Sequence, residues 1–320
     1  MKNDLQQSIL HLKKKNIKQH ELQWNGSKTF RESIMSEENA EKAAAVKTER
    51  NFKITLMFDG TNYHGWQRQP NGITVQEILE DRLFKLFGRT PVRVQGSSRT
   101  DAGVHALGMV GSFRAPESPY IPDDRLLRSL NKLLPEDIRI RSLEQVEDSF
   151  NARFSAEGKS YVYIIDTGTA EPFTSRWSWN LPDFTNLDAV RQALTYFVGE
   201  HDFKSYAVEA ANRDDTVRKI IRAELYECGP LKMIHFIGTG FLYKMVRSMV
   251  GAIAEVGRNR LAPERIGEIL EEKKRTPGRD TAPARGLFLV KVFYEPGEWE
   301  KYEMRQVPFA MRWSTWEGLL

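Results

Sequence analysis

The chain has 320 residues, enough for one large or two ordinary domains with a sizeable core. A hydrophobic content of 40% and a charged content of 28% are typical of globular proteins and argue against a disordered or fibrous chain. No apolar run approaches the ~18 residues of a membrane span. The single cysteine, Cys228, excludes an intrachain disulfide framework and a multi-cysteine zinc site. We therefore expect a protein of the reducing cytoplasm that is not bound to a membrane.

The net charge of +4 points weakly to an anionic partner. Residues 1–50 carry ten Lys and Arg against seven Asp and Glu, so the rest of the chain is close to neutral. A body that binds nucleic acid must therefore gather its positive charge on one face. Residues 1–50 are polar and lysine-rich, and we expect a flexible or partly helical N-terminal extension, either a mobile arm or one that contacts RNA phosphates.

The first half of the body has a clear order of elements. Residues 52–58, FKITLMF, alternate in the manner of a strand. Thr74 and Glu77 form a capping box ahead of a helix with one apolar face. There follow strands at 91–95 and 107–113, a helix capped by Asp123 or Asp124, and a strand at 138–143. The order is β-α-β-β-α-β.

The second half repeats this order. Its expected elements are a strand at 160–165, a helix near 186–198, strands at 217–226 and 231–238, a helix at 240–256 and a strand at 286–294. The repetition predicts an α+β fold of two ferredoxin-like (split βαβ) halves, residues 51–150 and 151–295, that share a continuous, mostly antiparallel sheet with helices on one side. Residues 296–320 are expected to form a C-terminal tail.

The segment GSSRTDAGVHA, residues 96–106, separates two hydrophobic runs and leaves two interpretations open. Asp101 can form an ordinary Asx-type turn with Arg99 as an incidental partner. Alternatively, the small residues Ala102 and Gly103 let a substrate approach a carboxylate that Arg99 keeps ionised. The loop offers no cysteine–histidine or serine–histidine pair beside Asp101, so hydrolase-type nucleophilic catalysis is not indicated.

The sequence predicts no cofactor and no metal. It contains neither a GxxxxGK[ST] phosphate loop nor a GxGxxG motif that opens a helix. Its six histidines are scattered, and none has the spacing of a zinc ligand set.

GSSRTDAGVHA resembles the signature of the TruA family of tRNA pseudouridine synthases, which is built around RTDxGVHA. Four more segments resemble family motifs in the same order: FDGTNYHGWQRQP, SFNARFSAEGKSYVY, FLYKMVRSMVG and ARGLFLVKVFY. The five motifs span about residues 51–294. The resemblance implies a duplicated ferredoxin-like fold and a homodimer that binds tRNA. It also implies cofactor-free isomerisation of uridine to pseudouridine at positions 38–40 of the anticodon stem-loop.

The resemblance also implies roles for particular residues. Asp101 would be the catalytic aspartate, as nucleophile or base, and Arg99 would help to open the RNA. Tyr161 would lie against the target base, and Arg247 would pair with Asp101. The remaining implied contacts are Leu287 in the pocket, and His105 and Arg153 toward the RNA or substrate. The loop itself also allows His105 a structural role or that of a hydrogen-bond partner.

The surroundings of Arg247 favour this pairing too, with Asp101 as the natural candidate for the anion. Arg247 lies in a helix among Met245, Val246 and Met249, and an arginine in such apolar surroundings needs a buried anion.

Two positions depart from the family pattern, and three rival functions remain. Ser98 stands where the family usually has glycine, and Lys244 stands where bacterial relatives often have histidine. The first rival is a pseudouridine synthase with another RNA target, and the second is a non-catalytic RNA-binding protein of the same fold. The third, a carboxylate-dependent glycosidase, would need a second acid that the sequence does not offer.

Overall fold

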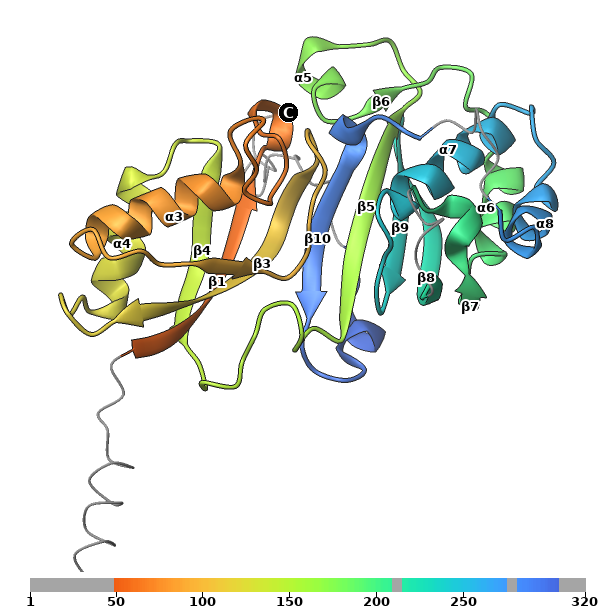
Figure 1. Cartoon of the computed structure of the whole chain (residues 1–320). Helices are drawn as coiled ribbons and strands as arrows, with labels where there is room; N and C mark the ends of the chain where they lie inside the picture. The colour runs from red at the N-terminus through yellow and green to blue at the C-terminus, as the bar shows by residue number, and fades with distance from the viewer. Residues whose placement is uncertain (1–48, 209–214, 275–280, 305–320) are drawn as a thin grey trace, which may run out of the picture. The chain divides into compact units, whose positions relative to one another are not determined.

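The computed structural model describes residues 49–208, 215–274 and 281–304 (Figure 1). Within these residues ten strands form one sheet in the order β4-β1-β3-β10-β5-β9-β8-β7, with β2 paired to β3 and β6 paired to β5. The expected N-terminal extension lies outside the described residues except for Glu49 and Arg50, which begin the first strand. Of the expected C-terminal tail, residues 305–320 lie outside them.

The first half follows the expected order. Its elements are β1 (Glu49–Phe58), α3 (Val75–Leu86), β2 (Val94–Gly96), β3 (His105–Pro116), α4 (Asp123–Leu133) and β4 (Ile138–Gln145). The side chain of Thr74 accepts a hydrogen bond from the Glu77 amide, as the capping box predicts. The expected cap of α4 was wrong: Pro122 occupies the cap position and makes no side-chain hydrogen bond there. Asp123 and Asp124 lie in the first turn, where their charge favours the positive end of the helix.

The second half contains the expected elements and several short additions. Its elements are β5 (Gly158–Asp166), α5 (Pro172–Ser175), β6 (Trp179–Asn180), α6 (Leu187–Thr195), β7 (Gly199–Asp202), β8 (Val217–Cys228), β9 (Leu231–Gly238), α7 (Met245–Gly257), α8 (Arg265–Glu271) and β10 (Leu287–Phe293). Helix α7 begins five residues later than expected, because Lys244 is in the left-handed conformation with φ of 56° and cannot continue a right-handed helix. The short helix α5, the short strands β6 and β7, and helix α8 were not predicted.

The strand order confirms the duplicated α+β fold. Within the first half the order is β4-β1-β3-β2, and within the second half β10-β5-β9-β8 has the same relation to the chain order. Strand β10 joins the halves, since it pairs antiparallel with β5 and parallel with the start of β3, where Phe288 faces His105. The boundary near residue 150 lies between β4 and β5 and stays a prediction.

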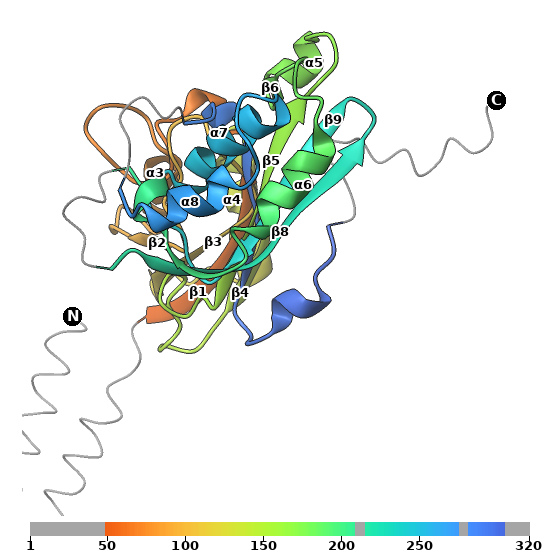
Figure 2. The same ribbon diagram turned by 90° about the vertical axis from the view of Figure 1, so that its right-hand side faces the viewer.

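Helices α3, α4, α6, α7 and α8 cover one face of the sheet (Figures 1 and 2). The main core lies between this face and the helices and includes Leu79, Leu130, Leu194 and Ile253. Tyr161 and Tyr163 of β5 belong to this core, whereas Val162 and Ile164 alternate onto the opposite face. The period of the strand therefore places Tyr161 on the helix side.

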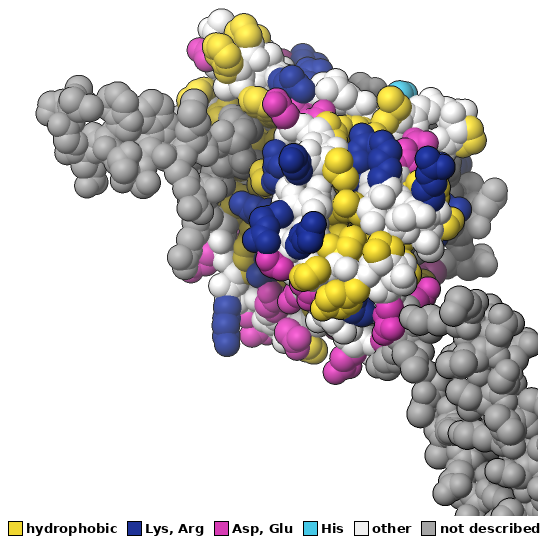
Figure 3. Space-filling model, turned by 90° about the vertical axis from the view of Figure 1, so that its left-hand side faces the viewer, with side chains coloured by type: hydrophobic (Ala, Val, Ile, Leu, Met, Phe, Trp, Pro, Cys, Tyr) yellow, Lys and Arg dark blue, Asp and Glu magenta, His cyan; other side chains and the backbone are white. Residues whose placement is uncertain are grey.

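The surface on the side of α3 and α4 is mixed in charge (Figure 3). Lys and Arg side chains gather over much of this face, with hydrophobic side chains between them and acidic side chains towards its lower edge. Exposed basic residues of α3, α4 and the loop after α3 are Lys85, Arg89, Arg93, Arg125, Arg128 and Lys132. None of the described helices is both long and apolar enough to cross a membrane.

Candidate active site

The loop between β2 and β3 carries Asp101 to the junction of the two halves. Strand β3 begins at His105, directly beside β10, so the loop lies where the halves meet. The Val104 amide donates to the Asp101 carbonyl at 3.1 Å, and Gly103 has φ of +78°, a conformation that favours glycine. The backbone of this segment therefore forms a turn. The Asp101 carboxylate takes no part in the turn and is paired with a residue outside the loop.

The first motif, FDGTNYHGWQRQP, packs against this loop and holds it in place. The Trp66 amide donates to the Thr100 carbonyl at 3.3 Å, and a Cβ at Gly65 would lie only 2.3 Å from that carbonyl oxygen. Gly65 also has φ of +83°. Trp66 packs so close to Gly96 that a Cβ there would lie 2.3 Å from its Nε1. Glycine at both positions allows FDGTNYHGWQRQP to hold the Asp101 loop in place.

Arg247 is the partner of the Asp101 carboxylate. Its Nη1 lies 2.6 Å from Asp101 Oδ2, and each side chain is 14% exposed. Its Nε donates to the Ala282 carbonyl at 2.8 Å, and the Ala282 amide donates back to the Arg247 carbonyl at 3.0 Å. The guanidinium is therefore fixed on both sides, in the first turn of α7, and supplies the positive charge that a mostly buried carboxylate requires.

Tyr161 closes the opposite side of the site. Its ring meets the edge of Phe241 with centroids 5.0 Å apart, and its hydroxyl lies 2.9 Å from Ser98 Oγ. Burial, with a smaller contribution from the Asp101 charge, raises the pKa of Tyr161 to about 12 against the opposing effect of the Ser98 hydrogen bond. Tyr161 is therefore a neutral phenol near pH 7.

These residues surround one cavity, which we call the Asp101 cavity. Its volume is about 40 Å³, and it is lined by Arg99, Thr100, Asp101, Val104, Tyr161 and Leu287 together with Phe241, Leu242 and the residues from Lys244 to Arg247. Five of the seven residues expected from the sequence line it: Arg99, Asp101, Tyr161, Arg247 and Leu287. Arg99 is exposed, and no ion pair joins its side chain to another of the described residues.

His105 lies outside the lining of the Asp101 cavity. Its ring is buried and stacks on Phe288 with centroids 4.8 Å apart. Its Nε2 lies 3.1 Å from the Arg285 carbonyl, and its Nδ1 lies 3.0 Å from the Gly60 amide and 3.1 Å from Asp59 Oδ1. Burial raises the pKa of Asp59, but the hydrogen bonds from His105 and Thr61 outweigh it and hold that pKa well below its ordinary value. His105 thus links three segments around the site.

Arg153 also lies outside the cavity lining. It is exposed, and its guanidinium lies 5.6 Å from the centre of the Phe154 ring. Its charge acts on Lys159, which precedes Tyr161 by two residues on β5 and shares its face. Burial, and then the charges of Arg153 and Arg218, lower the pKa of Lys159 to about 8. Basic groups therefore continue along β5 away from Tyr161.

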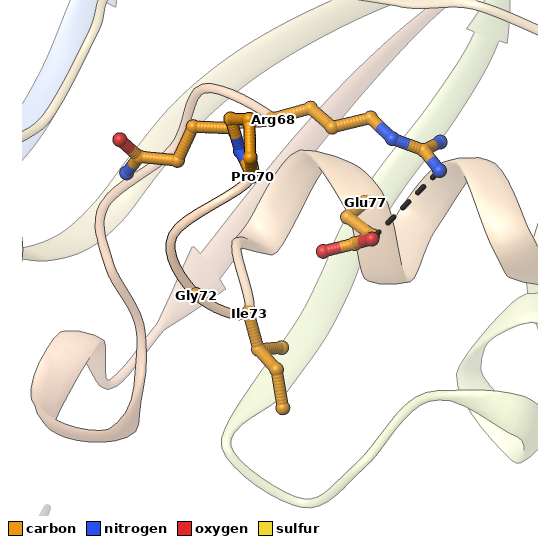
Figure 4. Close-up of a pocket in the computed structure, with 6 residues that line it drawn as sticks. Arg68, Pro70, Gly72, Ile73 and Glu77 are labelled. Carbon is orange, nitrogen blue, oxygen red and sulfur yellow. Dashed lines mark ion pairs between the residues drawn. The ribbon is translucent and has the colours of Figure 1, made fainter.

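A larger surface pocket of about 620 Å³ is lined by the end of the first motif, from Arg68 to Pro70, and by Gly72, Ile73 and Glu77 (Figure 4). Arg68 lies 3.7 Å from Glu77 and 3.3 Å from Glu80, so its charges are paired within the protein. This pocket shares no lining residue with the Asp101 cavity. Across the described part of the chain, no group of three His, Cys, Asp or Glu side chains could hold a metal ion.

The sequence did not reveal the contacts of Ser98, Phe241 and Lys159. The first two depend on how β5 and the segment before α7 approach the loop, which no local pattern encodes. Lys159 carries a signal that could have been used, because the period of two along β5 places it on the face of Tyr161.

Comparison with known proteins shows the family of this chain. The family model described as tRNA pseudouridine synthase matches residues 54–155 and 193–295. The tRNA pseudouridine synthase A of Exiguobacterium sibiricum is 43% identical over 245 residues, which cover 77% of this chain and 97% of the relative. The chain belongs to the TruA family of tRNA pseudouridine synthases.

Other TruA relatives match over the same extent. The tRNA pseudouridine synthase A of Geobacter sulfurreducens is 42% identical over 76% of this chain and 99% of its own length. The tRNA pseudouridine synthase A of Anoxybacillus flavithermus is 41% identical over 77% of this chain and 99% of its own length. These matches confirm the resemblance of the five motifs. A chain from the crystal structure of a Cbf5-Nop10-Gar1 complex aligns with 74% of this chain and 48% of its own, at 13% identity and a TM-score of 0.32, which is too low to carry an argument.

Proposed function

We propose that this chain isomerises uridine to pseudouridine in tRNA, at positions 38–40 of the anticodon stem-loop, with Asp101 as the catalytic carboxylate. One observation carries the proposal. This chain belongs to the family, and its Arg247 holds the Asp101 carboxylate at 2.6 Å. The carboxylate lies on the wall of a cavity that Tyr161 also lines. The anticodon stem-loop as target rests on the family alone.

The reaction exchanges one bond of the ribose for another. The bond from C1′ to N1 of uracil breaks, the uracil turns, and a bond from C1′ to C5 forms. N1 gains a proton and C5 loses one, so the conversion is a balanced isomerisation with no redox step. Asp101 can attack C1′ or C6, or take a proton from C2′, and each route starts from an ionised carboxylate.

Arg247 has a distinct task in this scheme. Its guanidinium holds Asp101 through Nη1 while the Ala282 carbonyl holds the guanidinium through Nε. The carboxylate is thus oriented toward the cavity before substrate arrives, so no reorganisation is needed when charge develops at the ribose.

Tyr161 supports the uracil by contact. A neutral phenol beside the cavity is suited to lie against a base and poorly suited to remove a proton, because its pKa is raised to about 12. After the new bond to C5 forms, the C5 proton can pass to the freed Asp101 carboxylate or to water.

The target base has to leave its stack and the cavity has to open. A volume of about 40 Å³ is close to that of a single water molecule, ~30 Å³. Arg99 and Lys244 line the cavity from the exposed side, and moving them would admit a flipped base. Arg99 would then contact RNA phosphates, and Lys159 and Arg153 would extend this basic track.

Two further parts of the proposal concern the setting of the enzyme. We place it in the cytoplasm, and the exposed free thiol of Cys228 fits a reducing compartment. We also propose a homodimer, because two copies can line one tRNA-binding groove although each carries little net charge. Sedimentation of the purified chain tests this, and a monomer at micromolar concentration would contradict it.

Mapping of pseudouridine in cellular tRNA tests the function. Cells that lack this protein should lose pseudouridine at positions 38–40, and wild type should restore it while Asp101→Asn does not. Failure of wild type to restore pseudouridine anywhere in tRNA would overturn the function. Restoration at other tRNA positions would retain the reaction and change the target.

A further inference from the structure

Ser98 is the residue of the Asp101 loop that stands where the family usually has glycine. It lies between Ser97 and Arg99, and it does not adopt a left-handed backbone conformation, so a side chain fits there without strain. The loop is firmly held at this point, because the Ser97 amide donates to the Val110 carbonyl at 2.8 Å and Ser97 Oγ accepts from the Val110 amide at 3.4 Å. Ser98 is therefore presented from a fixed backbone.

The Ser98 side chain reaches the one polar atom of Tyr161. Ser98 Oγ and the Tyr161 hydroxyl lie 2.9 Å apart, across 63 residues of sequence. Tyr161 is 6% exposed and its ring already meets Phe241 edge-on. Phe241 limits sideways movement of the ring, but an apolar edge contact does not fix the direction of the hydroxyl. Ser98 supplies that second constraint.

We propose that Ser98 is a positioning residue that acts through Tyr161. Its hydrogen bond holds the Tyr161 hydroxyl on the loop side, so that the ring keeps its position relative to Asp101 and the incoming uracil. This rests on the proposed function of the site. Because Ser98 and Asp101 belong to the same loop, the hydrogen bond ties the surface that contacts the base to the segment that carries the carboxylate. Without the Ser98 hydroxyl, Tyr161 would lose its polar partner and could turn relative to Asp101.

A double-mutant cycle tests this inference. Ser98→Ala removes the hydroxyl and keeps the Cβ, and Ser98→Thr keeps a hydroxyl. We expect Ser98→Ala to lower the single-turnover rate of pseudouridine formation roughly 3- to 10-fold, the size of one hydrogen bond. Ser98→Thr should recover most of this loss, and tRNA affinity should change little. In a Tyr161→Phe background Ser98→Ala should have almost no further effect.

Two controls separate positioning from general damage. Ser142→Ala removes an exposed hydroxyl on β4 and should leave the rate unchanged. The ¹³Cζ resonance of Tyr161, assigned by comparison with Tyr161→Phe, should move in Ser98→Ala and not in Ser142→Ala, a reading that needs no activity. An equal loss of rate in both tyrosine backgrounds, or a stationary Tyr161 resonance, would overturn the inference. Absence of any wild-type product would instead overturn the proposed function, while the resonance would still test the contact.

Discussion

Replacing Arg247 with Met tests the electrostatic design of the site. Met keeps an unbranched apolar side chain but carries no charge, so Asp101, which is 14% exposed beside Arg247, would lose its counter-charge. Removing one partner of a buried ion pair costs about 3–5 kcal/mol, and the remaining exposure favours the low end. The Ala282 carbonyl also loses the Nε donor at 2.8 Å, which adds about 1 kcal/mol. We therefore expect the free energy of unfolding to fall by about 4 kcal/mol.

The assay is urea unfolding of four proteins: wild type, Arg247→Met, Asp101→Asn and the double variant. In the double variant no charged carboxylate is left without a partner, so its loss of stability should be about 2 kcal/mol smaller than the sum of the single losses. Arg247→Lys should retain more stability than Arg247→Met, because it keeps the charge while losing the two-sided hold of the guanidinium. Single losses that add to within about 0.5 kcal/mol would refute the argument.

Three further predictions concern stability and RNA binding. His235 is buried, and burial, with the Arg222 charge, lowers its pKa to about 4 from an ordinary 6.5. The unfolded chain therefore binds the extra proton first, so wild type should lose up to about 3 kcal/mol relative to His235→Gln as pH falls from 6.5 to 4, and parallel pH profiles of unfolding would contradict this. Gly65→Ala should cost about 1–3 kcal/mol more than Gly229→Ala, since both have positive φ but only the Gly65 Cβ would meet a carbonyl, at 2.3 Å. Lys159→Ala and Arg153→Ala should each flatten the dependence of tRNA affinity on salt by ~0.7 to 0.9 in log–log slope, and an unchanged slope would remove that residue from the phosphate track.

Much of the fold could be predicted, because a helix or strand that is buried on one face shows a regular spacing of its hydrophobic residues. Strand β9 has the expected bounds, 231–238, and β1 begins within a few residues of the expected start. The start of α7 could not be predicted, because Lys244 leaves the helical conformation inside a sequence that reads as helix throughout. The predicted cap of α4 was wrong for a similar reason. Asp123 and Asp124 both suit a cap position by residue type, but the backbone conformation places Pro122 there.

The candidate site also has features that the sequence predicts and features that it does not. An arginine in apolar surroundings needs an anion, so the sequence around Arg247 predicts a buried anionic partner. The resemblance of the motifs to the TruA family implied that this partner is Asp101. The parallel pairing of β10 with β3, which places the Asp101 loop at the junction of the halves, has no local signature. The contact of Ser98 with Tyr161 depends on that long-range register, and for this reason the sequence left Ser98 without a role.

Single-turnover conversion of a tRNA transcript by purified Asp101→Asn tests the central claim most directly. Asparagine keeps the size of the side chain and removes its charge, so tRNA binding should stay within about 3-fold of wild type while the rate of pseudouridine formation falls roughly 10⁴-fold or more. Release of tritium from C5 of labelled uridine measures the rate, because C5 loses its proton in the product. A rate within about tenfold of wild type would contradict the assignment of Asp101 as the catalytic carboxylate.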